Sequence, residues 1–275
     1  MKHTAKKRFG QNFLIDQAII GSLVDAINPQ ADDLMVEIGP GLGALTKPLM
    51  QKLKLLHAVE LDRDICAWMV KDYPKQTAEK SLIIHNVDAL KYDFTSLGSH
   101  LRVTGNLPYN ISTPILFHLL GNVTGNVAAI KDMHFMLQKE VVERMVAQPS
   151  TPAYGRLSVM LQYHLAMEYL ITVPPDAFDP APKVESAFVR CVPHVILPFV
   201  AKDTTLFSKI VMAAFGQRRK TIRNTLKDFL DDDDWMLLSK IVDSSAKIKI
   251  GSQLRAENLS VEAYVLISNY ILSKS

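Results

Sequence analysis

Residues 106–109, Asn-Leu-Pro-Tyr, carry groups that could act on a nucleobase. They follow the apolar run 101–104 and precede a helical pattern. A tight turn here would present an amide, an unpaired carbonyl and an aromatic ring at the C-terminal end of a strand, where open α/β sheets bind ligands. The two oxygens could accept hydrogen bonds from an adenine amine, and the ring could stack on the base. An ordinary strand-to-helix turn is the alternative, because these residue types are common in turns.

A glycine-rich segment at residues 39–43, Gly-Pro-Gly-Leu-Gly, is a second candidate site. It stands between an apolar run of strand type and a helical stretch. Glycine lets the backbone turn tightly and lets a ligand approach closely, which makes Gly39 and Gly41 candidate binding residues. The Gly-x-Gly-x-Gly spacing differs from the dinucleotide fingerprint, so a nucleoside ligand without a phosphate is favoured over NAD.

Two carboxylates follow the next two expected strands. Glu60 lies at the end of the run 55–61, where a carboxylate can accept hydrogen bonds from ribose hydroxyls. Asp88 follows the run 81–85, where a carboxylate could accept from an adenine amine. Each acid alone could be a helix cap or part of a solvated turn. Three candidate sites after three consecutive strands instead indicate a class I S-adenosylmethionine (SAM) methyltransferase fold.

The elements that would position these residues alternate between strand and helix. Expected strands cover residues 34–38, 55–61, 81–85, 101–104 and 133–137, and expected helices cover 16–26, 44–52, 62–71, 111–120, 140–147 and 156–165. This alternation predicts an α/β fold with a mainly parallel sheet and helices on both faces. The runs 169–173 and 186–192 would suit an antiparallel pair at the sheet edge.

The character of the chain changes after Pro198. Only helical patterns follow, at residues 206–215, 220–230, 235–242 and 261–272. We therefore expect a catalytic, SAM-binding domain over residues 1–197 and a small all-α C-terminal domain over residues 198–275.

Basic residues gather locally, although the net charge is only +3. One cluster lies at the N-terminus, and a second comprises Arg218, Arg219, Lys220, Arg223 and Lys227. In a helix the last three of these would form one stripe, and a second, apolar stripe would comprise Ile222, Leu226 and Phe229. A basic ridge over an apolar seam could track phosphates of a nucleic acid. A solubilising helix face is the alternative.

Other features of the sequence narrow the class of protein. No apolar run approaches the ~18 residues of a membrane span, and no signal-peptide core follows the basic N-terminus, so we expect a cytoplasmic protein. Cys66 and Cys191 lie in apolar surroundings without metal-ligand spacing, and the histidines are scattered. We expect buried, reduced thiols, no metal site and a monomer.

Several motifs resemble the KsgA family of rRNA adenine N6,N6-dimethyltransferases, and most closely its bacterial members. The matching segments are residues 7–14 (Lys-Arg-Phe-Gly-Gln-Asn-Phe-Leu), 37–46, 106–112, 138–141, 178–187 and 215–221. They occur in the family's order over nearly the whole chain. The resemblance implies a Rossmann-like, seven-stranded class I fold with SAM as methyl donor. It also implies a substrate, two adjacent adenosines in the 3′-terminal hairpin of small-subunit (16S) rRNA, within a 30S precursor late in ribosome assembly.

Carried over by motif, the resemblance implies a set of SAM-binding residues: Asn12, Leu14, Gly39, Gly41, Glu60, Asp88, Ala89 and Asn106. The first two would border the methionine part of SAM, Glu60 would hold the ribose, and Asp88 and Ala89 would hold the adenine. Asp88 is less well fixed than Glu60, because the intervening loop 74–80 can vary in length.

The catalytic residues implied are Asn106, Pro108 and Tyr109. The Asn106 oxygen and the Pro108 carbonyl would accept the amine hydrogens and localise the nitrogen lone pair, without a strong general base. Tyr109 would stack on a base that has left the RNA helix. Phe13 and residues 178–180 could form further walls of the base pocket, or Phe13 could anchor the N-terminal arm.

Three rival readings remain. A resistance-type methyltransferase of large-subunit rRNA is disfavoured by Leu42 and Leu107, because that group usually carries Lys and Ile at these places. A DNA adenine methyltransferase usually carries a larger recognition domain than this tail. A non-catalytic ribosome-assembly factor is disfavoured by the intact glycine loop, Glu60 and Asn106.

Overall fold

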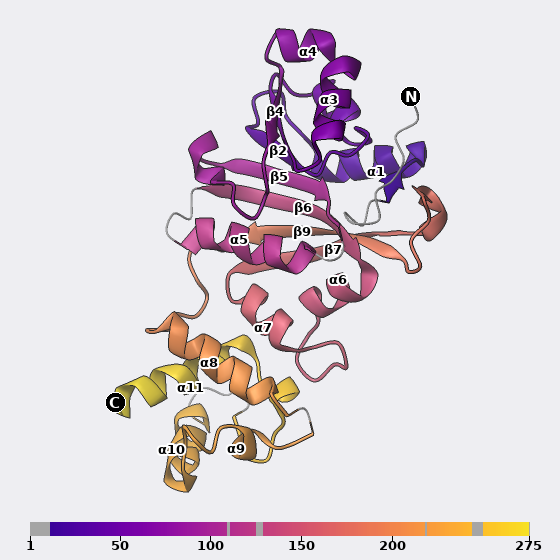
Figure 1. The fold of residues 1–275 in the computed structure, drawn as a ribbon. Helices are drawn as coiled ribbons and strands as arrows, with labels where there is room; N and C mark the ends of the chain where they lie inside the picture. The colour runs from indigo at the N-terminus through magenta and orange to yellow at the C-terminus, as the bar shows by residue number, and fades with distance from the viewer. Residues whose placement is uncertain (1–11, 109–110, 125–128, 218, 244–249, 275) are drawn as a thin grey trace. The chain divides into compact units, whose positions relative to one another are not determined.

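The computed structural model describes residues 12–108, 111–124, 129–217, 219–243 and 250–274 (Figure 1). They fall into two compact units. The first comprises the described parts of 1–142 and 166–195, and the second those of 143–165 and 196–275.

A seven-stranded sheet forms the centre of the first unit, in the order β4-β3-β2-β5-β6-β9-β7 (Figure 1). Its strands are β2 (Met35–Ile38), β3 (Leu56–Glu60), β4 (Leu82–Asn86), β5 (Leu101–Asn106), β6 (Ile130–Gln138), β7 (Leu165–Val173) and β9 (Ser186–Pro193). The pairs β3/β4, β2/β3, β2/β5 and β5/β6 are parallel, and β9 runs antiparallel to β6. The predicted mainly parallel sheet of seven strands is confirmed, with β9 and β7 at one edge.

The strand order reverses between β2 and β5. The chain runs outward from β2 through β3 to β4 and then returns to the other side of β2 as β5. At such a switch point the connections leave the sheet in opposite directions, and a crevice opens at the carboxyl ends of the strands. The glycine loop after β2 and the turn after β5 meet at this crevice.

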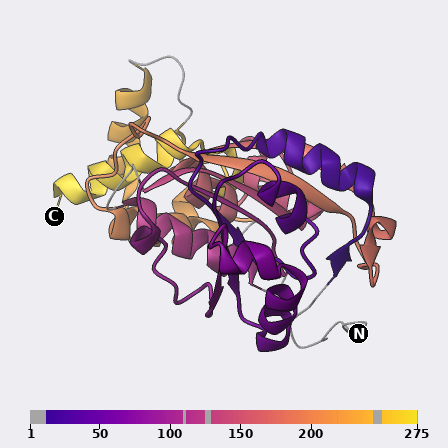
Figure 2. The same ribbon diagram turned by 90° about the horizontal axis from the view of Figure 1, so that it is seen from above.

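Helices cover both faces of the sheet. They are α1 (Gln17–Ile27), α2 (Thr46–Met50), α3 (Arg63–Asp72), α4 (Pro74–Ala78), the 3₁₀ turn η2 (Phe94–Leu97), α5 (Ser112–Thr124) and α6 (Lys139–Val146), which runs on into the second unit. The two views place α1 and α5 on opposite faces (Figure 1, Figure 2). Asp16 and Asp62 cap α1 and α3, because their carboxylates accept from the first free N–H groups of these helices. Helix α4 was not predicted.

Apolar side chains from both faces of the sheet form the core of the first unit. Every residue of β2 and β3 is buried, as expected for central parallel strands. Cys66 and Cys191 are free, buried thiols, as predicted. Burial raises the pKa of Cys66 to about 11 and that of Cys191 to about 12, which keeps both thiols protonated and unreactive at neutral pH.

A separate two-stranded sheet ties the start of the described chain to a distant segment of the first unit. β1 (Phe13–Leu14) pairs antiparallel with β8 (Phe178–Asp179), which follows the 3₁₀ turn η3 (Pro175–Ala177). Leu14 and Phe178 are both buried in the core. The segment that leads from β1 into α1 is therefore fixed by packing as well as by backbone hydrogen bonds.

The regular elements described in the second unit are helices and 3₁₀ turns, apart from the first residue of β7 and an isolated β-bridge between Thr221 and Arg255. Its elements are α7 (Arg156–Gln162), α8 (Thr204–Phe215), α9 (Ile222–Thr225), α10 (Asp232–Asp243), the 3₁₀ turn η4 (Ala256–Asn258) and α11 (Val261–Lys274). The predicted all-α character is observed. Residues 143–165, however, were expected in the first domain and belong to this unit. Tyr163 shows why: its ring lies 4.7 Å from that of Phe207, and its hydroxyl accepts from the Ala201 N–H at 3.1 Å.

The predicted helix over residues 220–230 is wrong. Only α9, four residues long, is helical there, and turns follow it. The N–H of Ile222 donates to the Leu254 carbonyl at 2.6 Å, so the start of the segment is held by a separate stretch of chain. Leu226 ends the helix with φ −109° and ψ 15°. The apolar seam survives in part, because Ile222, Leu226 and Leu230 are buried while Phe229 is only half-buried.

Candidate functional site

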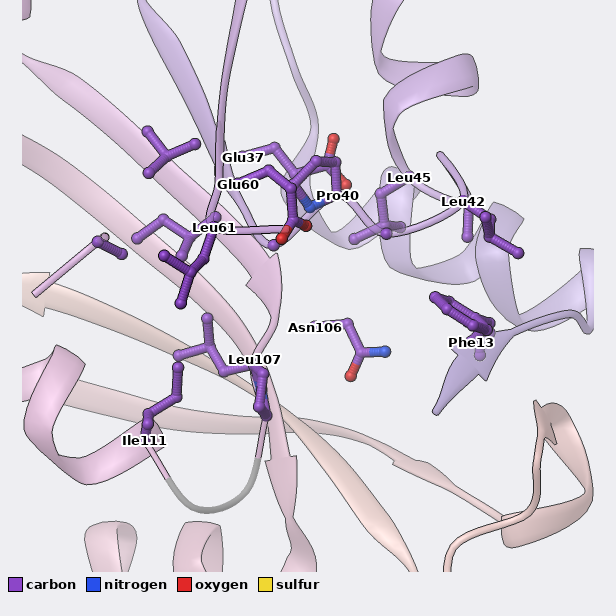
Figure 3. A pocket seen from close by; sticks show the side chains of 18 of the residues that line it. Phe13, Glu37, Pro40, Leu42, Leu45, Glu60, Leu61, Asn106, Leu107 and Ile111 are labelled. Atoms are coloured by element: carbon purple, nitrogen blue, oxygen red, sulfur yellow. The ribbon is translucent and has the colours of Figure 1, made fainter. Parts of the chain in front are cut away.

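A cavity of about 340 Å³ lies at the switch point of the first unit. Figure 3 shows side chains from β1, the glycine loop, β3 and β5 converging on it. Every residue that the sequence assigned to SAM binding lines this cavity: Asn12, Leu14, Gly39, Gly41, Glu60, Asp88, Ala89 and Asn106. Pro108 lines it too, whereas Tyr109 lies outside the described residues.

The glycine loop forms one wall of the cavity and depends on left-handed backbone. Gly39, Gly41 and Gly43 have φ of 66°, 54° and 77°. A side chain at such angles is strained. A Cβ on Gly41 would also lie 3.2 Å from the ring of Phe13, so this glycine leaves room for the aromatic ring across the cavity.

Gly105, which precedes Asn106 in β5, is a functional glycine that the sequence reasoning missed. A Cβ there would stand 2.3 Å from the backbone oxygen of Ile38, far inside contact distance. The ends of β2 and β5 can therefore approach closely only with glycine at this position. The sequence signal was a lone glycine at the end of an apolar run, which marks close backbone approach.

Glu37 is the second residue that was missed. It is buried within β2 and lines the cavity, and the Thr46 hydroxyl donates to its carboxylate at 2.6 Å. Burial raises its pKa from 4.5 to about 7, the Thr46 hydrogen bond opposes this, and the nearby charge of Glu60 adds to it. A carboxylate inside the apolar run 35–38 was the available signal.

Glu60 presents its carboxylate from the end of β3. The backbone N–H of Asp62 donates to Oε1 at 2.8 Å, which fixes the side chain. Burial raises the pKa of Glu60, against hydrogen bonds from the backbone N–H groups of Asp62 and Gly41, which lower it. Asp88 is held more locally, by accepting from the Leu90 N–H at 3.0 Å. Two carboxylates thus stand at the ends of neighbouring strands.

Apolar side chains supply the remaining walls of the cavity. They come from four successive connections and are Leu42, Leu45, Leu61, Val87, Leu107 and Ile111. Apolar walls with a few carboxylates suit a nucleoside, because the base can pack against the walls and the sugar hydroxyls can donate to the carboxylates.

Asn106 projects into the cavity from the end of β5. Its Nδ2 donates to the backbone oxygen of Asn12 at 3.0 Å. Among the residues that the structure describes, none donates to its Oδ1. Figure 3 shows the amide nitrogen on the side of Phe13 and the oxygen turned away from it.

The expectation of an unpaired carbonyl at Pro108 is wrong. The oxygen of Pro108 accepts from the N–H of Ile111 at 3.1 Å. This bond closes the turn that leads into α5. A carbonyl oxygen has two lone pairs, so the turn still leaves Pro108 one acceptor site.

The two aromatic residues proposed for the base pocket lie on paired strands but have different surroundings. Phe13 lines the cavity beside Gly41, and its backbone pairs with Asp179 in the two-stranded sheet. Phe178 is packed into the core instead. Phe13 therefore has both a pocket position and a place in the anchored arm.

The basic residues of the tail do not form the expected helical stripe. Arg219, Lys220, Arg223 and Lys227 are exposed within one short segment of the second unit, while Arg218 lies outside the described residues. Arg223 pairs with Asp232 at 2.5 Å. The segment keeps its cations on the surface although its helix is only four residues long.

The described residues also bear on other kinds of function. No helix there is long and apolar enough to cross a membrane. No group of three or more His, Cys, Asp or Glu side chains is placed to hold a metal ion within the same residues.

Known proteins resemble this chain over its whole length. The Ribosomal RNA small subunit methyltransferase A of Methylobacillus flagellatus is 63% identical over 98% of this chain and 99% of its own. That of Nitrosospira multiformis is 54% identical over 98% and 97%. A dimethyladenosine transferase from Plasmodium falciparum has the same fold, with a TM-score of 0.72 at 21% identity over 93% and 95% of the two chains.

The 23S rRNA methyltransferase ErmE is equally similar in fold, with a TM-score of 0.72 at 19% identity over 94% of this chain and 99% of its own. Fold similarity therefore does not separate the two kinds of rRNA methyltransferase. The relatives that are 54–63% identical over nearly the whole chain are small-subunit enzymes by name. The family model described as ribosomal RNA adenine dimethylase matches residues 2–272. With the pocket and its glycine loop in place, the chain belongs to the ribosomal RNA adenine dimethylase family.

Proposed function

We propose that this protein transfers methyl groups from SAM to the N6 amines of two adjacent adenosines in the 3′-terminal hairpin of small-subunit rRNA. The reaction takes place on a 30S precursor late in ribosome assembly. The family makes the protein an rRNA adenine dimethyltransferase with SAM as methyl donor, and relatives 54–63% identical act on the small subunit by name. The observation that carries the proposal for the site is that one nucleoside-sized cavity adjoins both the Asn106 amide and the Pro108 carbonyl.

The residues of the cavity fit SAM. Gly41 leaves space that a Cβ would fill, Glu60 would present its fixed carboxylate to the ribose hydroxyls, and Asp88 with Ala89 would border the adenine. Asn12 and Leu14 would border the methionine part. When bound, SAM supplies an electrophilic methyl group on its sulfonium.

Asn106 and Pro108 prepare the adenine nitrogen for attack. Each supplies one oxygen that accepts a hydrogen bond from one N–H of the amine. This draws the nitrogen toward a tetrahedral geometry and directs its lone pair at the methyl group. The two groups act by position and by stabilising the positive charge that develops on nitrogen. The transfer itself requires no general base, because the methylated nitrogen is a strong acid that releases its proton to water afterwards.

The same acceptors serve the second round of methylation. A monomethylated amine has only one hydrogen left, so one acceptor is enough. Asn106 is neutral and its charge does not change between rounds. Tyr109 is assigned, from the sequence, the role of stacking on the extruded base.

The second unit binds rRNA through its surface cations. Arg219, Lys220, Arg223 and Lys227 contact phosphates and position the enzyme without reading sequence, and Arg218 is assigned the same role from the sequence. The protein works in the cytoplasm as a monomer, without a metal ion.

The substrate is tested by offering labelled SAM to four acceptors. These are small subunits that lack the two dimethyladenosines, naked small-subunit rRNA, large subunits and DNA. Label should enter the small subunit, and dimethyladenosine should be the product. Label confined to large subunits would favour the resistance-type activity, and label in none would favour a non-catalytic assembly factor.

A further inference from the structure

The side-chain amide of Asn106 can serve the reaction in only one of its two orientations. With Oδ1 toward the adenine amine it accepts a hydrogen bond. Turned by half a rotation, it would present N–H groups to an amine that is becoming positive. We propose that the backbone carbonyl of Asn12 is a positioning group that selects the accepting orientation of Asn106. The inference rests on the acceptor role proposed for Asn106 above.

The geometry leaves a single assignment of the amide. The distance from the Asn106 side chain to the Asn12 oxygen is 3.0 Å, which is a hydrogen bond. A backbone carbonyl can only accept, so the atom that faces it must be the amide nitrogen. The oxygen then points the other way by covalent geometry. A reversed amide would bring two oxygens together at this distance.

The Asn12 carbonyl can do this because its segment is fixed by contacts far along the chain. Phe13 and Leu14 pair with Asp179 and Phe178 in the two-stranded sheet. The N–H of Ile15 donates to the Ala177 oxygen at 2.8 Å. Residues 177–179 thereby position a catalytic side chain more than seventy residues before them, and they do so without lining the cavity.

The variant Asn106→Asp tests the positioning by the Asn12 carbonyl separately from the acceptor role of residue 106. An ionised carboxylate keeps oxygens that can accept from the amine but has no proton to donate to the Asn12 carbonyl, and it repels that oxygen. A protonated carboxyl restores the donor and still presents a second oxygen to the substrate. Activity should therefore return with acid, which is the opposite of what an acceptor alone requires.

Turnover of Asn106→Asp is measured at saturating SAM and small subunits, as a ratio to the wild type at each pH. Taking the ratio cancels the effect that titration of the other cavity carboxyls, Glu37, Glu60 and Asp88, has on both proteins. We expect a loss of about 100-fold near pH 8, where the carboxyl is ionised. The ratio should then rise about tenfold for each pH unit toward the pKa of the introduced carboxyl. A ratio that stays flat or falls with acid overturns the proposal.

A second measurement does not depend on activity. Hydrogen exchange at the Ile15 N–H reports whether the arm stays paired with Ala177. In Asn106→Asp without substrate, exchange relative to the wild type should be faster near pH 8 and should return to the wild-type rate near pH 5.5. Equal protection at both pH values contradicts the proposal. Reversal by acid in the same sample also separates the effect from misfolding.

Asn106→Ala separates a failure of the acceptor role of Asn106 from a failure of its positioning by Asn12. If Asn106→Ala retains turnover, the acceptor role itself is wrong. If Asn106→Ala is inactive while Asn106→Asp is active and insensitive to acid, the acceptor role stands and the positioning by Asn12 is refuted.

Discussion

The buried carboxyl of Glu37 makes the stability of this protein depend on pH in a defined direction. Its pKa in the folded chain is about 7, against an ordinary value of 4.5. Below about pH 4.5 the group is protonated whether the chain is folded or not. Between 4.5 and 7 the unfolded chain releases the proton and the folded chain keeps it, so stability falls as pH rises. Above 7 the loss is complete.

The size of the effect follows from that difference in pKa. A rise from 4.5 to about 7 corresponds to a loss on the order of 3 kcal/mol once the group is ionised in both states. Glu37→Gln cannot ionise, and its amide oxygen can still accept from the Thr46 hydroxyl. The variant should therefore gain about 3 kcal/mol relative to the wild type across this range, which is a large part of a typical stability.

The assay is denaturant unfolding of the ligand-free wild type and of Glu37→Gln at a series of pH values through this range. Glu79→Gln is a matched control, because it removes an exposed carboxyl from the same unit. The free energy of unfolding of Glu37→Gln minus that of the wild type should rise with pH and level off above 7, while the control runs parallel to the wild type. A constant difference between Glu37→Gln and the wild type would refute the reasoning.

Three further predictions follow from the site and the basic segment. Gly105→Ala should destabilise the protein by about 1–3 kcal/mol and lower its Tm, because the added Cβ meets the Ile38 oxygen. Gly121→Ala is the control and should leave the Tm unchanged, because a Cβ added there meets no atom within 4 Å outside its own helix backbone. Asn106→Ala should lower methyl transfer by about 10²–10³-fold with rRNA affinity intact, and near-normal turnover would rule out the acceptor mechanism. Replacing Arg219, Arg223 and Lys227 by Gln should weaken rRNA binding and reduce its salt dependence by up to about three ion equivalents, with SAM binding unchanged in calorimetry. An unaltered rRNA affinity at moderate salt would mean that this segment does not contact phosphates.

The centre of the sheet could be predicted from the sequence because the strands β2, β3 and β5 are buried on both faces. Such strands read as short apolar runs, and each is followed by the polar residue or glycine that ends it. Gly39, Glu60, Asp88 and Asn106 stand at the carboxyl ends of successive parallel strands. They therefore meet around one crevice at that edge of the sheet. The eight residues expected to bind SAM accordingly line one cavity, and their binding roles stay a prediction.

Other features depend on contacts that no local pattern contains. The helix expected over residues 220–230 has the right apolar spacing, but its start is held by hydrogen bonds to residues 252–254 and it stops after one turn. Residues 143–165 follow a strand, as a helix of the first unit would, yet they pack with α8. The partner of the Pro108 carbonyl is equally a product of how the turn closes.

Glu37 and Gly105 show the same limit at the site itself. Glu37 lies inside an apolar run and Gly105 directly follows one, so both could be marked as unusual from the sequence. The reason for glycine at position 105 becomes visible only in the structure, where β2 and β5 lie side by side and the Ile38 oxygen faces Gly105.

The most direct test of the account is to locate the methyl groups on the substrate. Small subunits that lack them would be incubated with SAM and either the wild type or Asn106→Ala, and the rRNA would be digested and analysed by mass spectrometry. We expect N6,N6-dimethyladenosine at two adjacent positions in the 3′-terminal hairpin with the wild type, and unmodified adenosines with the variant. Methyl groups at another position or on another atom, or equal modification by Asn106→Ala, would contradict it.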